Sequence, residues 1–193
     1  MISGCVGPQD DGYDPAERLT APAAQEYHST QIETFSATAA DMVTAITMTY
    51  ADEAIGLTRA AQAAGMPVAI SFTVETDGRL PSSQALGEAI EQVDEETGGG
   101  PAYYMINCAH PTHFDGAVGA DGAWRGRIRG LRANASTKSH AELDEAVELD
   151  TGDPADLGER YAALTELLPN LNVLGGCCGT DHRHVQAIAD AWP

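Results

Sequence analysis

The sequence predicts an α/β fold in which parallel strands alternate with helices. Short apolar runs recur at intervals of roughly 30 residues, and the segments between them show the apolar spacing of amphipathic helices. Strands joined in this way form right-handed crossovers, either in an open sheet or in a closed barrel. In both arrangements the loops that follow the strands lie on one face of the fold.

Six apolar runs are predicted to be strands. The third run is almost entirely apolar, as expected for a strand that is covered on both faces. The predicted strands are residues 2–6, 41–47, 67–72, 102–106, 128–133 and 171–174.

Helices are predicted between these strands. Gly65 occupies the position after a helix C-terminus, and Asp153 followed by Pro154 gives an N-cap with proline in the first turn. The predicted helices are residues 21–35, 51–64, 83–97, a segment from 153 to about 168, and 181–192. The last helix is expected to bury Val185, Ile188, Ala189 and Trp192. The His-rich and Gly-rich segment after Cys108 is expected to be irregular.

Three cysteines follow predicted strands, and they are the most informative feature of the chain. Cys108 follows the fourth strand, and Cys177 and Cys178 follow the last. Three thiolates that meet at one point describe a zinc site with an open fourth position, which is typical of catalytic rather than structural zinc. Adjacent cysteines point to opposite faces of a regular strand, so a shared metal requires a bend that the surrounding glycines permit. The alternatives are buried free cysteines or a strained vicinal disulfide.

The separation between the cysteines favours a barrel. Cys108 and Cys177 are two βα units apart, so a single strand is expected between theirs. The curvature of a barrel lets such strand ends point toward a shared centre better than a flat sheet does.

Composition excludes several classes of function. The chain has 193 residues, with 10 basic and 29 acidic side chains and a net charge of −19. Nucleic acid is therefore not an expected partner, because phosphate binding requires basic patches. The acidic surface suits either high salt or general solubility. The absence of a long apolar run or a leader pattern predicts a cytoplasmic protein without a membrane span.

The motifs Asn107-Cys108 and Gly175-Gly176-Cys177-Cys178-Gly179-Thr180 resemble the zinc motifs of the homocysteine S-methyltransferase family. Residues 3–8, 70–74 and 132–135 are similar to that family's third, fifth and seventh strand segments. The resemblance implies an α/β (β/α)₈ barrel of TIM type, present here as about six βα units, strands 3 to 8. Residues 1–193 would then form a single homocysteine S-methyltransferase-like domain, truncated at its N-terminus.

The same resemblance implies a zinc-dependent S-methyltransferase that converts homocysteine to methionine. Cys108, Cys177 and Cys178 would be the zinc ligands, and the methyl donor would be S-methylmethionine, S-adenosylmethionine or betaine. The family commonly has a glutamate after its fourth strand that contacts the substrate amino group. Here residues 45–50 contain none, and Glu53 is expected within the next helix. Another thiol acceptor is therefore an alternative, as is an inactive zinc-binding fragment or subunit. A homo-oligomer could cover the open barrel edges.

Other polar residues near these motifs have weaker expected roles. Asn134 ends a strand on the catalytic face and is expected either to bind substrate or to form a turn. His110 and His113 are expected to be exposed loop residues rather than ligands, and His182 and His184 to be surface or supporting groups. The remaining cysteine, Cys5, is expected to be buried. The acidic cluster is interpreted as a solvated face. It contains Glu142, Asp144, Glu145, Glu148 and Asp150.

Overall fold

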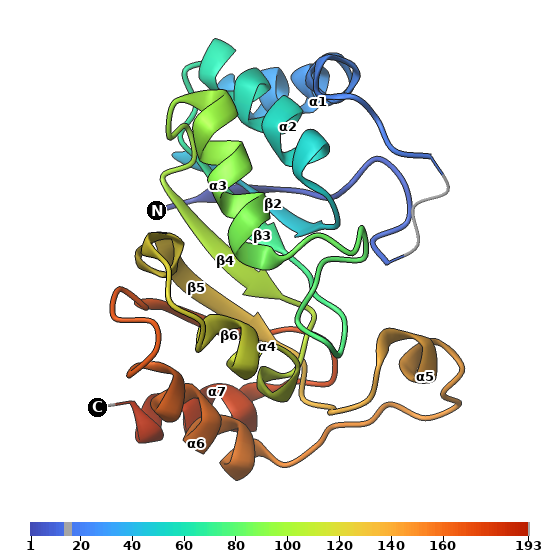
Figure 1. Cartoon of the computed structure of the whole chain (residues 1–193), viewed down its shortest axis with the longest axis vertical. Coiled ribbons are helices and arrows are strands. Elements are labelled where there is room, and N and C mark those ends of the chain that lie inside the picture. Colours follow the sequence, from blue (N-terminus) through green and yellow to red (C-terminus); the bar gives the residue numbers. More distant parts are fainter. Residues whose placement is uncertain (14–16, 193) are drawn as a thin grey trace. The chain divides into compact units, whose positions relative to one another are not determined.

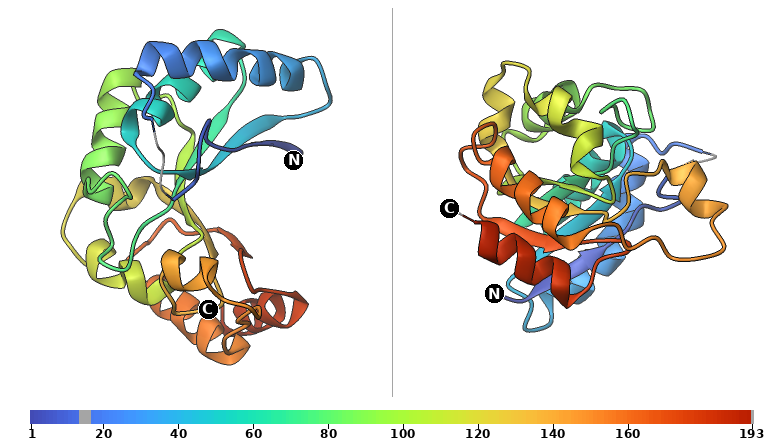
Figure 2. Two further views of the ribbon diagram at one scale, coloured as in Figure 1. Left: turned by 90° about the vertical axis from the view of Figure 1, so that its right-hand side faces the viewer. Right: turned by 90° about the horizontal axis from the view of Figure 1, so that it is seen from below.

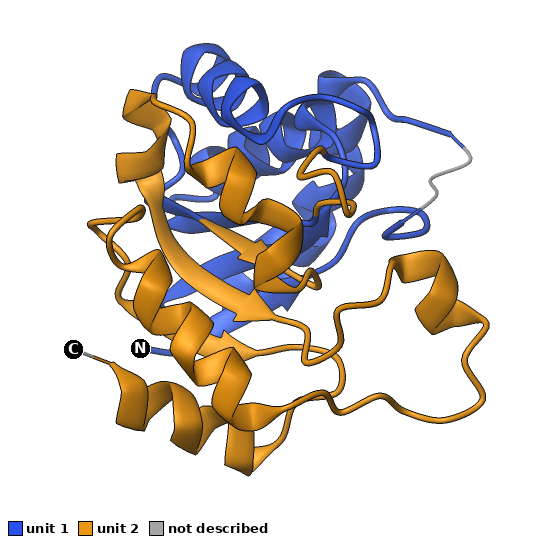
Figure 3. Cartoon of the chain, turned by 60° about the horizontal axis from the view of Figure 1, so that its bottom comes forward, with its two compact units in different colours: residues 1–73, 80–104 blue, residues 74–79, 105–193 orange. Residues whose placement is uncertain are grey.

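The computed structural model describes residues 1–13 and 17–192. It divides the chain into two compact units (Figure 3). Unit 1 contains Met1–Thr73 and Leu80–Tyr104, and unit 2 contains Val74–Arg79 and Met105–Pro193. The order of the strands in the sheet follows the chain, from β1 to β6 (Figure 1). The predicted alternation of parallel strands and helices is therefore confirmed.

Unit 1 contains the first three strands and the first three helices. β1 pairs in parallel with β2, and β2 with β3, which is buried along its whole length. Helices α1 and α2 lie side by side (Figures 1 and 2). The elements are β1 (Ser3–Val6), α1 (Ala21–Ser36), β2 (Met42–Met48), α2 (Ala51–Ala63), β3 (Val68–Phe72) and α3 (Leu86–Thr97).

Unit 2 contains the end of β4 and the elements that follow it. β4 (Tyr103–Asn107) contributes its first two residues to unit 1 and its last three to unit 2. β5 pairs in parallel with β6, and α6 and α7 lie side by side (Figures 1 and 2). The elements are α4 (Pro111–Val118), the 3₁₀ helix η1 (Ala123–Arg127), β5 (Ile128–Ala133), α5 (His140–Asp144), α6 (Pro154–Leu164), β6 (Val173–Gly176) and α7 (His182–Ala191).

Each predicted strand is present, with its ends displaced by at most two residues. The prediction of an irregular segment after Cys108 is wrong, because α4 forms there. Pro111 is compatible with its first turn, and Phe114 and Val118, four residues apart, are buried on one face. Helix α3 begins three residues later than predicted, since Ser83 has a left-handed backbone (φ 68°).

Several burial predictions are also wrong. Val185 is 52% exposed, Ala189 is exposed and Trp192 is only half-buried, because the buried face of α7 is formed by His184 and Ile188. Cys5 is exposed, because buried and exposed residues alternate along β1 and Cys5 lies on the exposed side. Among the described residues, no helix combines the length and apolar character needed to cross a membrane.

A buried ionisable pair connects α1 to α2. His28 on α1 contacts Glu53 in the first turn of α2, with 3.0 Å between Nε2 and Oε1, and both side chains are 1% exposed. The same carboxylate oxygen accepts a 2.7 Å hydrogen bond from the backbone N–H of Gln9. Burial of a carboxylate is costly unless it is paired in this way. Glu53 therefore lies within a helix, as predicted. Its carboxylate contacts both α1 and the segment that contains Gln9.

Close packing between α1 and α2 depends on Gly56. A Cβ atom at this position would collide with the backbone oxygen of Ala21 and would lie 2.5 Å from Cβ of Ala24. Both contacts belong to α1, so the two helix backbones approach too closely for a side chain. Glycine is required at position 56 because there is no room for a side chain, not because the backbone adopts an unusual conformation.

We predict that Gly56→Ala destabilises the protein by about 1–3 kcal/mol, because the overpacking strain exceeds the gain in helix propensity. Gly116→Ala on α4 is the matched control, since its Cβ would meet nothing within 4 Å. The control should be neutral or stabilising. Urea unfolding of both variants checks the prediction, and equal stabilisation by both would contradict it.

Candidate metal centre

The three predicted cysteines converge in unit 2. Cys108 directly follows β4, and Cys177 and Cys178 directly follow β6. The Sγ atoms of Cys108 and Cys177 are 2.8 Å apart, and all three sulfurs lie within 4.8 Å of one another. All three are free thiols, which excludes the vicinal disulfide as the form present in this structure. Among the described residues, this is the group whose side chains could hold a metal ion.

Cys108 leaves the strand through an unusual backbone conformation. Its φ of 55° lies in the left-handed region, which costs a non-glycine residue about 1–3 kcal/mol and persists only where the surroundings enforce it. The backbone N–H of Cys108 donates to the carbonyl of Arg132 on β5 over 3.1 Å. The residue is therefore still joined to the neighbouring strand while its chain turns away from strand geometry.

The vicinal cysteines lie in a turn attached to the end of β5. The N–H of Cys177 donates to the carbonyl of Ala133, and the carbonyl of Cys178 accepts from the N–H of Ala135. Thr180 closes the turn, since its hydroxyl donates to the carbonyl of Cys177 over 2.7 Å. Gly179 has φ 77°, so the expected departure from strand geometry occurs there.

Asn134 links the two cysteine segments. It is 2% exposed and follows β5, the strand between β4 and β6 in the sheet order. Its Nδ2 donates to the carbonyl of Cys108 over 3.0 Å, and its Oδ1 accepts from the N–H of Cys178 over 3.1 Å. One side-chain amide thus fixes both segments at once. The expected contact between Asn134 and substrate stays a prediction.

Hydrogen bonding among the cysteines and burial oppose ionisation of the thiols. Hydrogen bonding to Cys108 and to Cys178, together with burial, raises the pKa of the Cys177 thiol far above its usual value. The hydrogen bond with Cys108 and burial also raise the pKa of Cys178. Adjacent thiolates repel each other, so the neutral forms are favoured. A bound cation would reverse this preference, because metal coordination stabilises thiolates.

The prediction that His110 and His113 are exposed loop residues is wrong. His110 is 1% exposed and caps α4, where Nδ1 accepts from the N–H of Thr112. Burial lowers the pKa of His110 to about 4, so its ring is neutral at pH 7. His113 is 9% exposed, and its Nε2 donates to the carbonyl of Thr137 over 2.9 Å. Neither belongs to the cysteine cluster.

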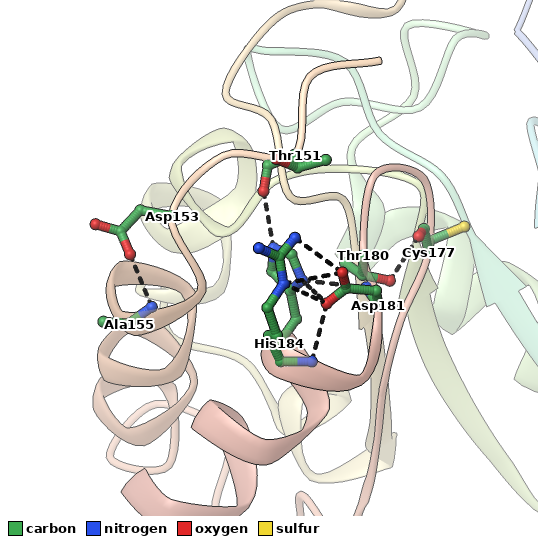
Figure 4. Close-up of polar contacts among 8 residues, drawn as sticks. Thr151, Asp153, Ala155, Cys177, Thr180, Asp181 and His184 are labelled. Carbon is green, nitrogen blue, oxygen red and sulfur yellow. Dashed lines mark hydrogen bonds and ion pairs between the residues drawn. The ribbon is translucent and has the colours of Figure 1, made fainter.

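His184 supports the turn that carries the vicinal cysteines, whereas His182 is exposed. The imidazole of His184 is fully buried, and its Nδ1 accepts from the N–H of Asp181 at the start of α7. Its Nε2 donates to the carbonyl of Thr151 over 2.8 Å (Figure 4). These bonds attach the chain just after the cysteine turn to the segment before α6. The expected supporting role of His184 thus has a defined geometry.

One contact of the cluster was not predicted from the sequence. The Nε2 of His140 lies 2.6 Å from the carbonyl oxygen of Cys108. His140 begins α5, a short helix in a segment for which no helix was predicted. The Ser139 N-cap and Glu142 form a capping box, which could have indicated this helix.

Comparison with known proteins identifies the family. The model of the homocysteine S-methyltransferase family matches residues 1–192. The chain belongs to this family. A search of curated proteins finds no significant match to this homocysteine S-methyltransferase family member.

Solved structures of the homocysteine methyltransferase MmuM from Escherichia coli resemble this family member. The apo form matches with a TM-score of 0.68 and 18% identity, and the metallated form with 0.70 and 18%. The oxidized form matches with 0.70 and 17%. This likeness supports the predicted fold, an incomplete barrel of TIM type. The matches cover 98%, 98% and 93% of this chain but only 62%, 60% and 55% of MmuM.

We predict that Asn134→Ala destabilises unit 2 by about 1–3 kcal/mol, because it removes the amide partner of the buried Cys108 carbonyl and of the part-buried Cys178 N–H. Asn172→Ala, at an exposed position, is the matched control. Urea unfolding of the metal-free variants measures the difference. Equal stability of the two variants would show that the amide bridge contributes nothing.

Proposed function

We propose that this chain carries the zinc centre of an S-methyltransferase and that homocysteine is the methyl acceptor, with methionine as product. The convergence of the Cys108, Cys177 and Cys178 sulfurs within 4.8 Å is the observation that carries the proposal. Membership of the homocysteine S-methyltransferase family supports the same chemistry.

The donor set fits zinc. Three thiol sulfurs and no fourth side-chain ligand in the described cluster leave one position of a tetrahedral ion for substrate. Sulfurs bound to one tetrahedral zinc lie ~3.8 Å apart, given a Zn–S distance of about 2.3 Å. Binding would therefore move Cys108 and Cys177 apart by about 1 Å from their present 2.8 Å. Thiolate ligands also favour zinc over magnesium or calcium.

The ion, when bound, supplies a Lewis acid that makes a thiol available as a thiolate at neutral pH. The three cysteines would hold it, and Asn134 fixes the backbone of Cys108 and Cys178. In the transfer, the acceptor sulfur forms a bond to the methyl carbon and its proton is released. The sulfonium or ammonium donor keeps the electron pair of the bond that breaks. S-methylmethionine, S-adenosylmethionine and betaine all satisfy this requirement.

A second acceptor is favoured by the end of β2. The family resemblance implies a glutamate in this region, but residues 45–50 contain none. Thr47 lies here in a left-handed conformation (φ 60°), within an irregularity of the β2–β3 pairing between Ala45 and Met48. Without a carboxylate, the recognition of an amino group would differ. A methyltransferase for another thiol is therefore the second candidate.

We predict that the wild-type chain binds about one zinc ion and that Cys178→Ser weakens zinc binding more than about 100-fold, since it removes a ligand rather than a supporting group. Cys5→Ser is the control, because Cys5 is an exposed thiol of unit 1. Metal analysis and competition with a chromophoric chelator measure both variants. A zinc-free wild-type protein, or equal affinity of the two variants, would refute the assignment.

We further predict methyl transfer to homocysteine from at least one of the three donors, and its loss in Cys178→Ser. Quantification of methionine by mass spectrometry checks this, with circular dichroism to show that each sample is folded. Turnover with another thiol but not with homocysteine would support the second candidate. No turnover with any thiol by folded, zinc-loaded protein would favour the inactive zinc-binding fragment or subunit.

A further inference from the structure

Two side chains hold the carbonyl group of Cys108 from different directions. Asn134 donates to this oxygen over 3.0 Å from the end of β5, and His140 donates over 2.6 Å from the start of α5. A carbonyl oxygen has two lone pairs, so these bonds use its full capacity. The group therefore has a fixed direction, although it belongs to a residue that has left regular strand geometry.

Glu75 orients the imidazole of His140. Its Oε1 lies 3.2 Å from Nδ1, on the side of the ring opposite the Cys108 carbonyl. The side chain of His140 is only 9% exposed, whereas that of Glu75 is 36% exposed. A carboxylate beside one ring nitrogen fixes the rotation of the imidazole, and with it the direction in which the other nitrogen points. The order of contacts is Glu75 carboxylate, His140 ring, Cys108 carbonyl.

The segment that carries His140 is attached to unit 2 at further points. The ring of His113 donates to the carbonyl of Thr137, and the hydroxyl of Ser136 donates to Asp150 over 2.9 Å. Lys138 also pairs with Asp150, with 3.5 Å between Nζ and Oδ2. These contacts restrict the positions that His140 can take. The bond between His140 and the Cys108 carbonyl is therefore held in place by the neighbouring contacts of residues 136–138.

We propose that Glu75 and His140 form a positioning pair for the metal centre. The pair fixes the left-handed backbone of Cys108 and thereby holds its sulfur beside those of Cys177 and Cys178. Neither residue coordinates the ion in this arrangement, because His140 is directed at the backbone oxygen of Cys108 and Glu75 at His140. The inference rests on the proposed zinc-dependent function, and it assigns a role to two residues outside the cysteine motifs.

We predict that His140→Ala lowers zinc affinity about 10-fold, as expected for the loss of a group that supports a ligand. His140→Gln should stay within about 3-fold of wild type, because its side-chain amide can donate in place of Nε2. Glu75→Ala should weaken binding in the same direction as His140→Ala. Chelator competition gives the affinities, and the sulfur-to-metal absorption bands of the cobalt(II) form report whether three thiolates still bind.

The matched control is His182→Ala, which makes the same histidine-to-alanine change at another position. His182 is exposed and, among the described residues, does not belong to the cysteine cluster. Thermal unfolding of the metal-free variants separates loss of zinc affinity from a general loss of stability. Wild-type affinity in His140→Ala, or equal weakening in His140→Ala and His140→Gln, would overturn the pair alone. Failure of the wild-type chain to bind zinc would overturn the proposed function and the pair together.

Discussion

The arrangement of the three clustered cysteines depends on the side-chain amide of Asn134. Cys108 follows β4 and Cys178 follows β6, and β5 separates these strands in the sheet order. A group at the end of β5 is therefore the one that can reach both segments. Because an amide has a donor at one end and an acceptor at the other, it satisfies the carbonyl of Cys108 and the N–H of Cys178 together. The strand that separates the two cysteine segments, β5, thus also carries the residue that connects them, Asn134.

Backbone hydrogen bonds position the three thiols. Cys108 is joined to Arg132, and the turn at Cys177 and Cys178 is joined to Ala133 and Ala135. Proximity raises the pKa of the Cys177 and Cys178 thiols, so ionisation is unfavourable until a cation arrives. The fold therefore orders the cysteine segments before any metal binds. Zinc binding would be coupled to the release of protons from the thiols.

The sequence predicted the strands and the meeting of the cysteines because both depend on local signals. Apolar runs mark buried strands, and parallel strands bring their following residues to one face. The bonds of Asn134 were not predictable, since the strand order brings it near both cysteine segments but does not show which backbone groups its amide meets. His140 had no periodic signal, because α5 contains only five residues and none is buried. The burial of His110 depended on recognising α4, which has only eight residues and therefore a weak helical periodicity.

The buried pair of His28 and Glu53 has a consequence for how sequences related to this one can diverge. Removal of one partner leaves an uncompensated polar group inside unit 1, whereas exchange of both for apolar side chains of similar volume can be nearly neutral. Single substitutions should therefore be rare at either position, and paired substitutions should be tolerated. Positions 28 and 53 are expected to covary among homologues, with apolar pairs found together and mixed pairs depleted.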